Sequence, residues 1–311
     1  MTGSPVIAVT APAFCRSKAL RDELTVLFPS SVFNPSSEYF SEDDLIRFLS
    51  NAEAAIVGRD PVTEKVIASL PDLRIVAKYG VGLDNINSSA LEKYGIALGW
   101  TPGVNKRSVA EMTLCFMLGL ARNIFSAAQE LKSGRWNKNG GFQLTGKTVG
   151  IVGFGHIGKE VARLLRPFDC RILVQDIINI AEQAELLRAE VCGFDELIKL
   201  SDFVTLHVPL TSDTRHMMDS ETLHRMKKSA FLINTSRGEI VDQGALKQAL
   251  VNGVIAGVAL DVFFPEPPED LEFITLPNLI STPHTGGNSI EAVEAMGRSA
   301  IGHLCDFFSR D

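Results

Sequence analysis

The sequence has few cysteines and no excess of basic residues. Its five cysteines are scattered through 311 residues without C-x-x-C spacing, which argues against a structural zinc site and favours reduced, buried thiols. Thirty-seven acidic residues outweigh 30 Lys and Arg residues, and the net charge is −7. Nucleic acids and anionic membranes require a basic face, so neither is expected as a partner, and no metal is expected. The cysteines are Cys15, Cys115, Cys170, Cys192 and Cys305.

Long apolar runs are also absent. No run reaches the length needed to cross a membrane, and the N-terminus lacks the basic stretch and long apolar core of a secretory signal. We therefore expect a cytoplasmic protein. The chain is 45% hydrophobic, which is ample for two domains of ordinary size.

The most informative stretch is an apolar strand at 148–152 that leads directly into the pattern G-x-G-x-x-G. A glycine turn is the alternative interpretation, but a segment with helical spacing follows, as a dinucleotide site requires. Gly153 permits the tight turn, Gly155 lets the backbone approach a pyrophosphate, and Gly158 lets the helix pack on the strand. His156 and Ile157 complete the loop, where the helix N-terminus offers amides to the phosphates.

A second strand, at 171–174, leads to Asp176. An acid about 20 residues beyond the first glycine accepts hydrogen bonds from an adenosine ribose. No basic residue follows Asp176 directly, so the 2′-phosphate of NADP would meet an uncompensated carboxylate. NAD is the expected cofactor.

Strands and helices alternate along nearly the whole chain, which predicts parallel sheets with helices on both faces. Thr101-Pro102-Gly103 interrupts the alternation, and we place a domain crossover there. The last helix, at 290–308, follows the completed dinucleotide domain and could pack on the first domain. We therefore predict an α/β protein with two doubly wound parallel-sheet domains, formed by residues 1–102 with 288–311 and by residues 103–287.

A helix at 109–121 is apolar on almost every side, and Ser108 and Glu111 have the spacing of a capping box at its start. A helix without a polar face must be covered all round. We therefore predict that the helical region near 105–132 forms a homodimer interface. Full burial within one chain is the alternative.

Three later strands lead to residues with complementary chemistry, namely Arg237, Glu266 and His284. Ligands of open parallel sheets bind beyond the carboxyl ends of the strands, so these side chains are expected to converge there. Asp261 lies in an otherwise apolar strand and needs a hydrogen-bond partner, either a carboxamide or a backbone group. The turn Gly80-Val81-Gly82 could present amides to an anion or could be a plain glycine turn.

Four motifs in this order and spacing resemble the D-isomer-specific 2-hydroxyacid dehydrogenase family. They occupy residues 153–158, 234–238, 259–263 and 283–287. The resemblance implies a flavodoxin-like substrate domain built from both chain ends, an inserted Rossmann domain and a dimer formed through the long helix. The residues expected to contact NAD are Gly153, Gly155, His156, Ile157, Gly158, Asp176, Val208, Thr235, Ser236, Asp261 and Gly286.

The resemblance also implies catalytic roles. It assigns Arg237 to the substrate carboxylate, His284 to the proton and Glu266 to the histidine. Formate-oxidising relatives carry glutamine in place of Glu266, so that activity is not expected. Reduction of a 2-keto acid needs a hydride at the carbonyl carbon and a proton at its oxygen, and histidine suits the proton transfer. A neighbouring carboxylate favours imidazolium, and a guanidinium can hold the substrate carboxylate by a two-point fork.

Two other functions fit the same fold: a dinucleotide-sensing protein that resembles the transcriptional corepressors, and a related dehydrogenase that oxidises a compound such as phosphite. The retained catalytic set favours a dehydrogenase.

The expected substrate is a small anionic D-2-hydroxy acid. Within the family the chain resembles phosphoglycerate dehydrogenases most, although it stops without their C-terminal regulatory domain. Arg59, Lys78 and Lys138 stand where those enzymes place basic residues around a phosphate, while Val81 and Gly82 would bind the substrate with Arg237. Each cation could instead be an ordinary solvated side chain. We expect 3-phosphoglycerate first, and glyoxylate or hydroxypyruvate second.

Overall fold

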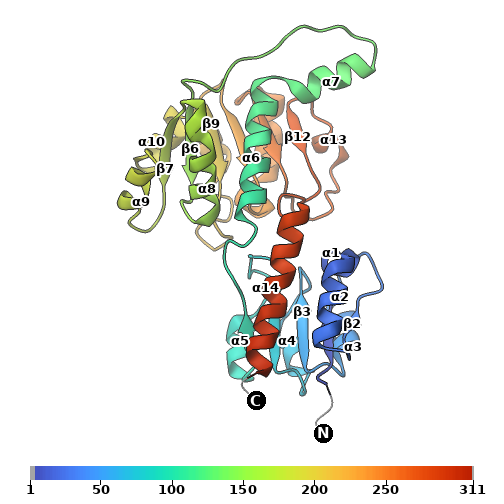
Figure 1. Cartoon of the computed structure of the whole chain (residues 1–311). Coiled ribbons are helices and arrows are strands. Elements are labelled where there is room, and N and C mark those ends of the chain that lie inside the picture. The colour runs from blue at the N-terminus through green and yellow to red at the C-terminus, as the bar shows by residue number, and fades with distance from the viewer. Residues whose placement is uncertain (1–3, 310–311) are drawn as a thin grey trace. The chain divides into compact units, whose positions relative to one another are not determined.

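The computed structural model describes residues 4–309 and divides into two compact units (Figure 1). Unit 1 combines the chain up to Asn105 with the chain from Gly287 onward, and unit 2 comprises Lys106–Gly286. Each unit has its own parallel sheet, so the predicted α/β class is confirmed.

Unit 1 is built on a five-stranded parallel sheet of order β2-β1-β3-β4-β5. Alternate residues of a strand face opposite sides, so Ile7 and Val9 join one apolar core whereas Ala8 joins the other. Helix α14 packs on β4 and α2. The strands are β1 (Ile7–Val9), β2 (Val32–Phe33), β3 (Ala54–Val57), β4 (Ile75–Lys78) and β5 (Ala97–Gly99), and the helices are α1 (Pro12–Arg16), α2 (Lys18–Leu27), α3 (Glu42–Leu49), α4 (Glu64–Ala68), α5 (Ser88–Lys93) and α14 (Ile290–Phe308).

Unit 2 contains a seven-stranded parallel sheet of order β12-β11-β10-β9-β6-β7-β8. The strands are β6 (Thr148–Val152), β7 (Arg171–Gln175), β8 (Glu190–Val191), β9 (Phe203–Leu206), β10 (Phe231–Asn234), β11 (Gly257–Leu260) and β12 (Leu279–Ser281). The helices are α6 (Lys106–Ala121), α7 (Ile124–Lys132), α8 (His156–Leu165), α9 (Ala181–Leu186), α10 (Phe194–Leu200), α11 (Ser220–Arg225), α12 (Gln243–Val251) and α13 (Leu271–Ile274), with 3-10 turns η1 (Arg166–Phe168) and η2 (Gly238–Ile240).

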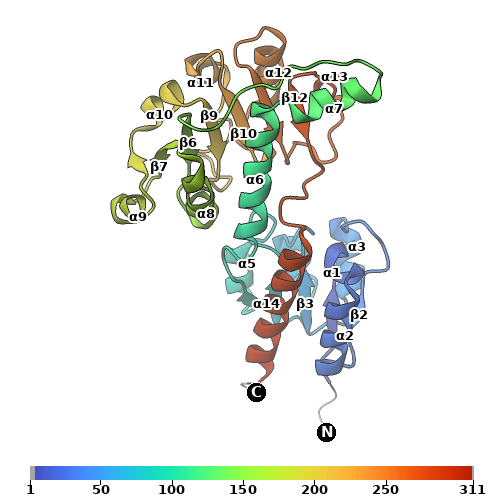
Figure 2. The same cartoon turned by 45° about the horizontal axis from the view of Figure 1, so that its top comes forward.

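Helices α6 and α8 lie side by side on one face of this sheet (Figures 1 and 2). Glu160 on α8 is 7% exposed and links them. It accepts hydrogen bonds from Arg163 on its own helix and, at 2.9 Å, from Arg107 Nη1 on α6. The Arg163 guanidinium and, against the effect of burial, Arg107 hold the pKa of Glu160 below its ordinary value.

The predicted capping box at Ser108 and Glu111 is wrong. Helix α6 begins at Lys106, so Ser108 lies inside the first turn, and its hydroxyl donates instead to the carbonyl oxygen of Gly286 at 2.6 Å. Glu111 pairs with Arg107. The residue spacing of a capping box is present, but the helix begins two residues before Ser108.

The predicted burial of the thiols is also wrong. All five cysteines are free, four are partly exposed, and Cys115 on α6 is exposed. Cys115 shares the open side of α6 with Glu111, which is also exposed, so one side of this apolar helix is left uncovered.

Helix α7 follows α6 after a bend of 63°. Asn123 makes the break, with a φ of 52° in the left-handed region, where asparagine is tolerated better than most residues. None of the side chains of α7 is buried, and Ile124, Phe125 and Leu131 are 52%, 40% and 57% exposed. No single described helix is long and apolar enough to cross a membrane, and only the bent pair of α6 and α7 meets the criteria of length and composition.

Candidate active site

The glycine loop connects β6 to α8 as the sequence predicted. Gly153 has a φ of +89°, and a Cβ on it would lie 2.6 Å from the carbonyl oxygen of His207. A Cβ on Gly158 would lie 2.1 Å from the carbonyl oxygen of Gly153. Both positions therefore require glycine because neither backbone could move away without opening the sheet.

The same loop is open where a pyrophosphate would approach. A Cβ added to Gly155 would meet nothing within 4 Å, and no side chain caps the amides at the start of α8. Uncapped amides at a helix N-terminus carry partial positive charge and suit phosphate oxygens. His156 and Ile157 are the first two residues of this helix. These features fit NAD.

Asp176 lies just beyond the end of β7, and its carboxylate is hydrogen-bonded to the glycine loop. Its Oδ2 accepts a hydrogen bond of 2.7 Å from the Phe154 amide, and its Oδ1 accepts one of 3.4 Å from the Ile178 amide. A carboxylate has about four acceptor sites, so oxygens held in this way can still accept hydrogen bonds from ribose hydroxyls.

His284 and Glu266 come together at the carboxyl edge of the sheet. The Nδ1 atom of His284 is 2.9 Å from Oε2 and 3.1 Å from Oε1 of Glu266. Glu266 is held in turn by the Phe263 amide, which donates to Oε1 at 3.0 Å. No described residue lies within hydrogen-bonding distance of Nε2, so the imidazole is fixed at one nitrogen and open at the other.

The loop that carries His284 is fastened by Asp261, which is 1% exposed. Its Oδ1 accepts from the Thr285 amide at 2.8 Å and the Thr282 hydroxyl at 2.6 Å, and its Oδ2 accepts from the Gly286 amide at 2.7 Å. Of the two partners considered for this acid, the chain's own backbone is the one observed. His284 itself has a φ of 52°, a conformation that such a set of bonds can maintain.

Arg237 follows β10 in a turn that Asn234 shapes. Asn234 Nδ2 donates to the Arg237 carbonyl oxygen at 2.7 Å, and its Oδ1 accepts from the Ser236 amide at 3.0 Å. A Cβ on Gly238 would lie 2.2 Å from the Phe263 carbonyl carbon. Glycine is therefore required directly after Arg237, because the backbone there touches the segment that leads to Glu266.

Three further residues expected at the cofactor lie between these loops. Ser236 donates from its hydroxyl to the Leu206 carbonyl oxygen at 2.5 Å. The Thr235 hydroxyl is buried 3.3 Å from that of Thr113, and the Cγ1 atom of Val208 would be 2.9 Å from a Cβ on Gly153. They line the carboxyl ends of β9 and β10, beside the glycine loop.

His207, which the sequence left without a role, lies at the same edge. Its Nε2 is 2.9 Å from the Thr205 hydroxyl, while its Nδ1 is buried without a hydrogen-bond partner among the described residues. Burial lowers the pKa of this imidazole to about 3. The ring is therefore neutral at physiological pH.

In unit 1 the turn Gly80-Val81-Gly82 follows β4. Gly80 has a φ of +120°, and within the described residues no acceptor lies within hydrogen-bonding distance of these three amides. The Val81 carbonyl oxygen accepts from Trp100 Nε1 at 3.0 Å. Successive open amides of this kind suit an anion.

The three candidate phosphate-binding cations have different surroundings. Lys138 is exposed in the loop after α7, and the guanidinium of Arg59 lies 5.8 Å from the centre of the Tyr39 ring. Lys78, by contrast, is 5% exposed, so the alternative of a solvated side chain is wrong for this residue.

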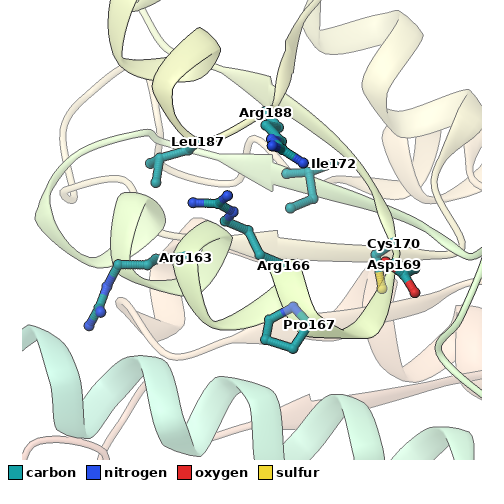
Figure 3. Close-up of a pocket in the computed structure, with 8 residues that line it drawn as sticks. All are labelled: Arg163, Arg166, Pro167, Asp169, Cys170, Ile172, Leu187 and Arg188. Carbon is teal, nitrogen blue, oxygen red and sulfur yellow. The ribbon is translucent and has the colours of Figure 1, made fainter.

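One pocket in unit 2 lies away from this site. It measures about 550 Å³ and is formed around η1 and the start of β7 (Figure 3). That is the amino end of the strand, whereas parallel sheets bind ligands at the carboxyl ends. Its lining contains none of the predicted site residues: Arg163, Arg166, Pro167, Asp169, Cys170, Ile172, Leu187 and Arg188. Within residues 4–309 no cluster of His, Cys, Asp and Glu could hold a metal ion.

Known proteins are similar to this chain in both sequence and fold. Residues 114–286 match the family described as D-isomer specific 2-hydroxyacid dehydrogenase, NAD binding domain. A hydroxypyruvate reductase of Thermotoga maritima is 38% identical over 84% of this chain and 87% of its own. A D-3-phosphoglycerate dehydrogenase of Methanocaldococcus jannaschii is 40% identical over 83% of this chain but only 50% of its own. The structure of an Aquifex aeolicus D-lactate dehydrogenase with NAD and lactic acid has a TM-score of 0.86 at 27% identity, and covers 98% of this chain and 96% of its own.

The fold, the glycine loop and these relatives define an NAD-dependent oxidoreductase. The chain belongs to the D-isomer specific 2-hydroxyacid dehydrogenase family, whose members interconvert 2-hydroxy acids and 2-keto acids.

Proposed function

We propose that His284 delivers the proton when this enzyme reduces a small anionic 2-keto acid, and that Glu266 and Arg237 complete the catalytic set. NADH supplies the hydride. The observation that carries this proposal is the pair of bonds of 2.9 and 3.1 Å between Glu266 and Nδ1 of His284. A carboxylate on Nδ1 fixes the ring and favours a proton on Nε2, which is the nitrogen left open for the carbonyl oxygen of a substrate.

Arg237 would bind the substrate carboxylate. Its backbone is held by Asn234, and its side chain is half-buried, so the guanidinium has a defined position. A two-point bond to the carboxylate fixes which face of the carbonyl meets the hydride.

The NAD contacts proposed for unit 2 are those of the glycine loop, with Asp176 at the adenosine ribose. Val208, Thr235, Ser236, Asp261 and Gly286 would line the remainder. In unit 1, Arg59, Val81 and Gly82 are proposed to contact the substrate, which is glyoxylate, hydroxypyruvate or the keto acid of 3-phosphoglycerate.

We also propose a homodimer formed through α6 and α7. The support is the uncovered side of α6 together with the apolar residues of α7, because a monomer gains nothing from exposing Ile124, Phe125 and Leu131. Light scattering should give twice the mass of the chain, and Leu131→Glu should give the monomer. A wild-type monomer at micromolar concentration would reject this interface. Five free thiols support a reducing compartment, and we propose the cytoplasm.

The test of the proposed function is NADH absorbance with a panel of 2-keto acids. Reduction of glyoxylate, hydroxypyruvate or phosphohydroxypyruvate, and its loss in His284→Gln, would support the proposal. Tight binding of NADH without turnover of any keto acid would favour the dinucleotide-sensing alternative.

A further inference from the structure

The ammonium group of Lys78 points into the framework of unit 1. Lys78 is the last residue of β4, and its Nζ donates to the Gly58 carbonyl oxygen at 2.5 Å and to Asn85 Oδ1 at 2.6 Å. Gly58 follows β3, and Asn85 follows the turn Gly80-Val81-Gly82. One lysine therefore joins the loops that follow two neighbouring strands.

Asn85 strengthens the same connection. Its Nδ2 donates to the carbonyl oxygens of Gly58 at 3.1 Å and of Asp60 at 2.6 Å. The side-chain amide thus accepts from Lys78 and donates to both ends of the segment Gly58–Asp60. Arg59, the middle residue of this segment, has its backbone held on both sides.

Asp60 anchors the segment from the other direction. Its side chain is fully buried, and it accepts hydrogen bonds from the Phe40 amide at 3.0 Å, the Gly58 amide at 3.3 Å and the Thr10 hydroxyl. None of these three donors is a cation, so the carboxylate is stabilised by neutral groups from three parts of the chain.

These bonds decide what Lys78 can do for a substrate. Reaching a phosphate would require the ammonium to leave two oxygens, one of them the carbonyl that orders Arg59. The Gly58 carbonyl oxygen would then keep only the 3.1 Å bond from Asn85, and two shorter bonds of a buried ammonium would be lost at a cost in stability. Lysine offers one compact point charge, whereas the planar guanidinium of arginine matches the geometry of a phosphate at two points.

We propose that Lys78 is a positioning residue that, through Asn85, fixes Gly58–Asp60 against the turn Gly80–Gly82, and that the enzyme therefore prefers small unphosphorylated 2-keto acids to phosphohydroxypyruvate. The inference rests on the proposed function for its substrate class. Arg59 and the open amides of the turn then bind a substrate that has one carboxylate and a short side chain. Lys78 determines the position of Arg59 and of these amides.

Substrate discrimination tests the proposal. kcat/KM is measured for glyoxylate, hydroxypyruvate and phosphohydroxypyruvate in the wild type, Lys78→Met, Lys78→Arg, Asn85→Leu and the double variant Lys78→Met with Asn85→Leu. Lys93→Met is the matched control, because Lys93 is an exposed lysine of unit 1 that pairs with Glu64 and lies over the Tyr94 ring, both outside this network.

We expect the wild type to favour the unphosphorylated acids. Lys78→Met should lower kcat/KM by roughly tenfold for all three substrates alike. Asn85→Leu should lower kcat/KM to the same extent, and the double variant should be little slower than either single variant. Lys78→Arg should also have low kcat/KM, because the larger guanidinium does not fit the buried position. A selective loss with phosphohydroxypyruvate that Lys78→Arg restores would overturn the proposal.

Amine labelling of the wild type tests the position of Lys78 without using activity. With an N-hydroxysuccinimide acetate reagent and mass spectrometry, Lys78 should react far more slowly than Lys93, and phosphohydroxypyruvate should not change its rate. Surface-like reactivity of Lys78 that phosphohydroxypyruvate suppresses would overturn the inference. If no keto acid is reduced but Lys78 remains protected, the proposed function fails while the positioning role stands.

Discussion

The two units use charged residues at strand ends in opposite ways. In unit 2, Glu266 and Asp261 hold the loop of His284 and leave Nε2 of the imidazole open. In unit 1, Asp60 and Lys78 direct their charges to backbone groups of the same unit. Both sets stand at the carboxyl edge of a parallel sheet, so location alone does not distinguish a reacting group from a supporting one.

The hydrogen-bond partners make that distinction. An open atom on an otherwise fixed side chain, such as Nε2 of His284, is available for chemistry. A charged atom that donates to a backbone carbonyl and to a side-chain amide of the same unit, such as Nζ of Lys78, is part of the framework. The predictions below test this contrast, beginning with the largest expected effect.

Replacing the open imidazole should have the largest consequence. His284→Gln should lower kcat by about 10² or more, because general acid catalysis contributes that much. NADH affinity, measured by fluorescence titration, should stay nearly unchanged. His224→Gln is the control, since His224 is exposed on α11 and its Nδ1 hydrogen-bonds to the Ser220 carbonyl oxygen of the same helix. An equal loss of NADH affinity in His284→Gln would contradict the assignment.

Loosening the support beneath His284 should have a smaller effect. Asp261→Asn places an amide nitrogen among the donors of Thr282, Thr285 and Gly286, so about 1–3 kcal/mol of stability should be lost through unpaired groups. kcat should fall with little change in the KM for the keto acid. Urea unfolding and steady-state rates measure both effects, and Asp213→Asn in an exposed loop is the control. Full activity in Asp261→Asn would show that the loop does not depend on this acid.

A substitution at the proposed NAD site of unit 2 should change the cofactor preference and leave the turnover number nearly unchanged. Asp176→Ala removes the ribose acceptor and the repulsion of a 2′-phosphate, so the NADH to NADPH ratio of kcat/KM should fall by roughly tenfold or more. The turnover number with saturating NADH should change little. An unaltered ratio would mean that Asp176 serves only to hold the Phe154 amide.

The smallest effect on catalysis is expected at the link between α6 and α8, where the change is one of stability. Glu160→Gln should lower the free energy of unfolding by about 1–3 kcal/mol at neutral pH, because a buried carboxylate bonded to Arg107 and Arg163 is lost. The folded pKa is lowered, so this contribution is complete above the ordinary value of 4.5 and is lost as the pH falls through the folded value. Urea unfolding of both proteins should therefore converge in acid. The exposed Glu111→Gln is the control, and a difference that persists in strong acid would contradict the ionic explanation.

Much of the fold could be predicted from short apolar runs with clear ends. Strand β6 and helix α14 have the expected bounds because buried residues repeat at the spacing of the element. The two-residue strand β2 was missed since it is too short to show a period. The helical region near 105–132 was predicted, but its division into α6 and α7 was missed, because no residue of α7 is buried and none therefore marks its start.

The positions of the side chains proposed for catalysis could be predicted because each follows a strand of the parallel sheet. Their supports could not. Asn234 and Thr282 act through bonds that close only in the folded turn, and the network of Thr10, Asp60 and Asn85 joins residues 50 and 25 positions apart. The one local signal of this network in the sequence is Asp60, which comes directly after Gly58-Arg59 at the end of a strand. Many solvent-exposed aspartates occupy the same kind of position.

A double-mutant cycle on His284 and Glu266 tests the central claim most directly. kcat for hydroxypyruvate reduction is measured in the wild type, His284→Gln, Glu266→Gln and the double variant, with NADH saturating. If Glu266 acts by holding Nδ1 of His284, the double variant should be no slower than His284→Gln alone. Losses that multiply in the double variant would show that the two side chains act independently, and would contradict the account.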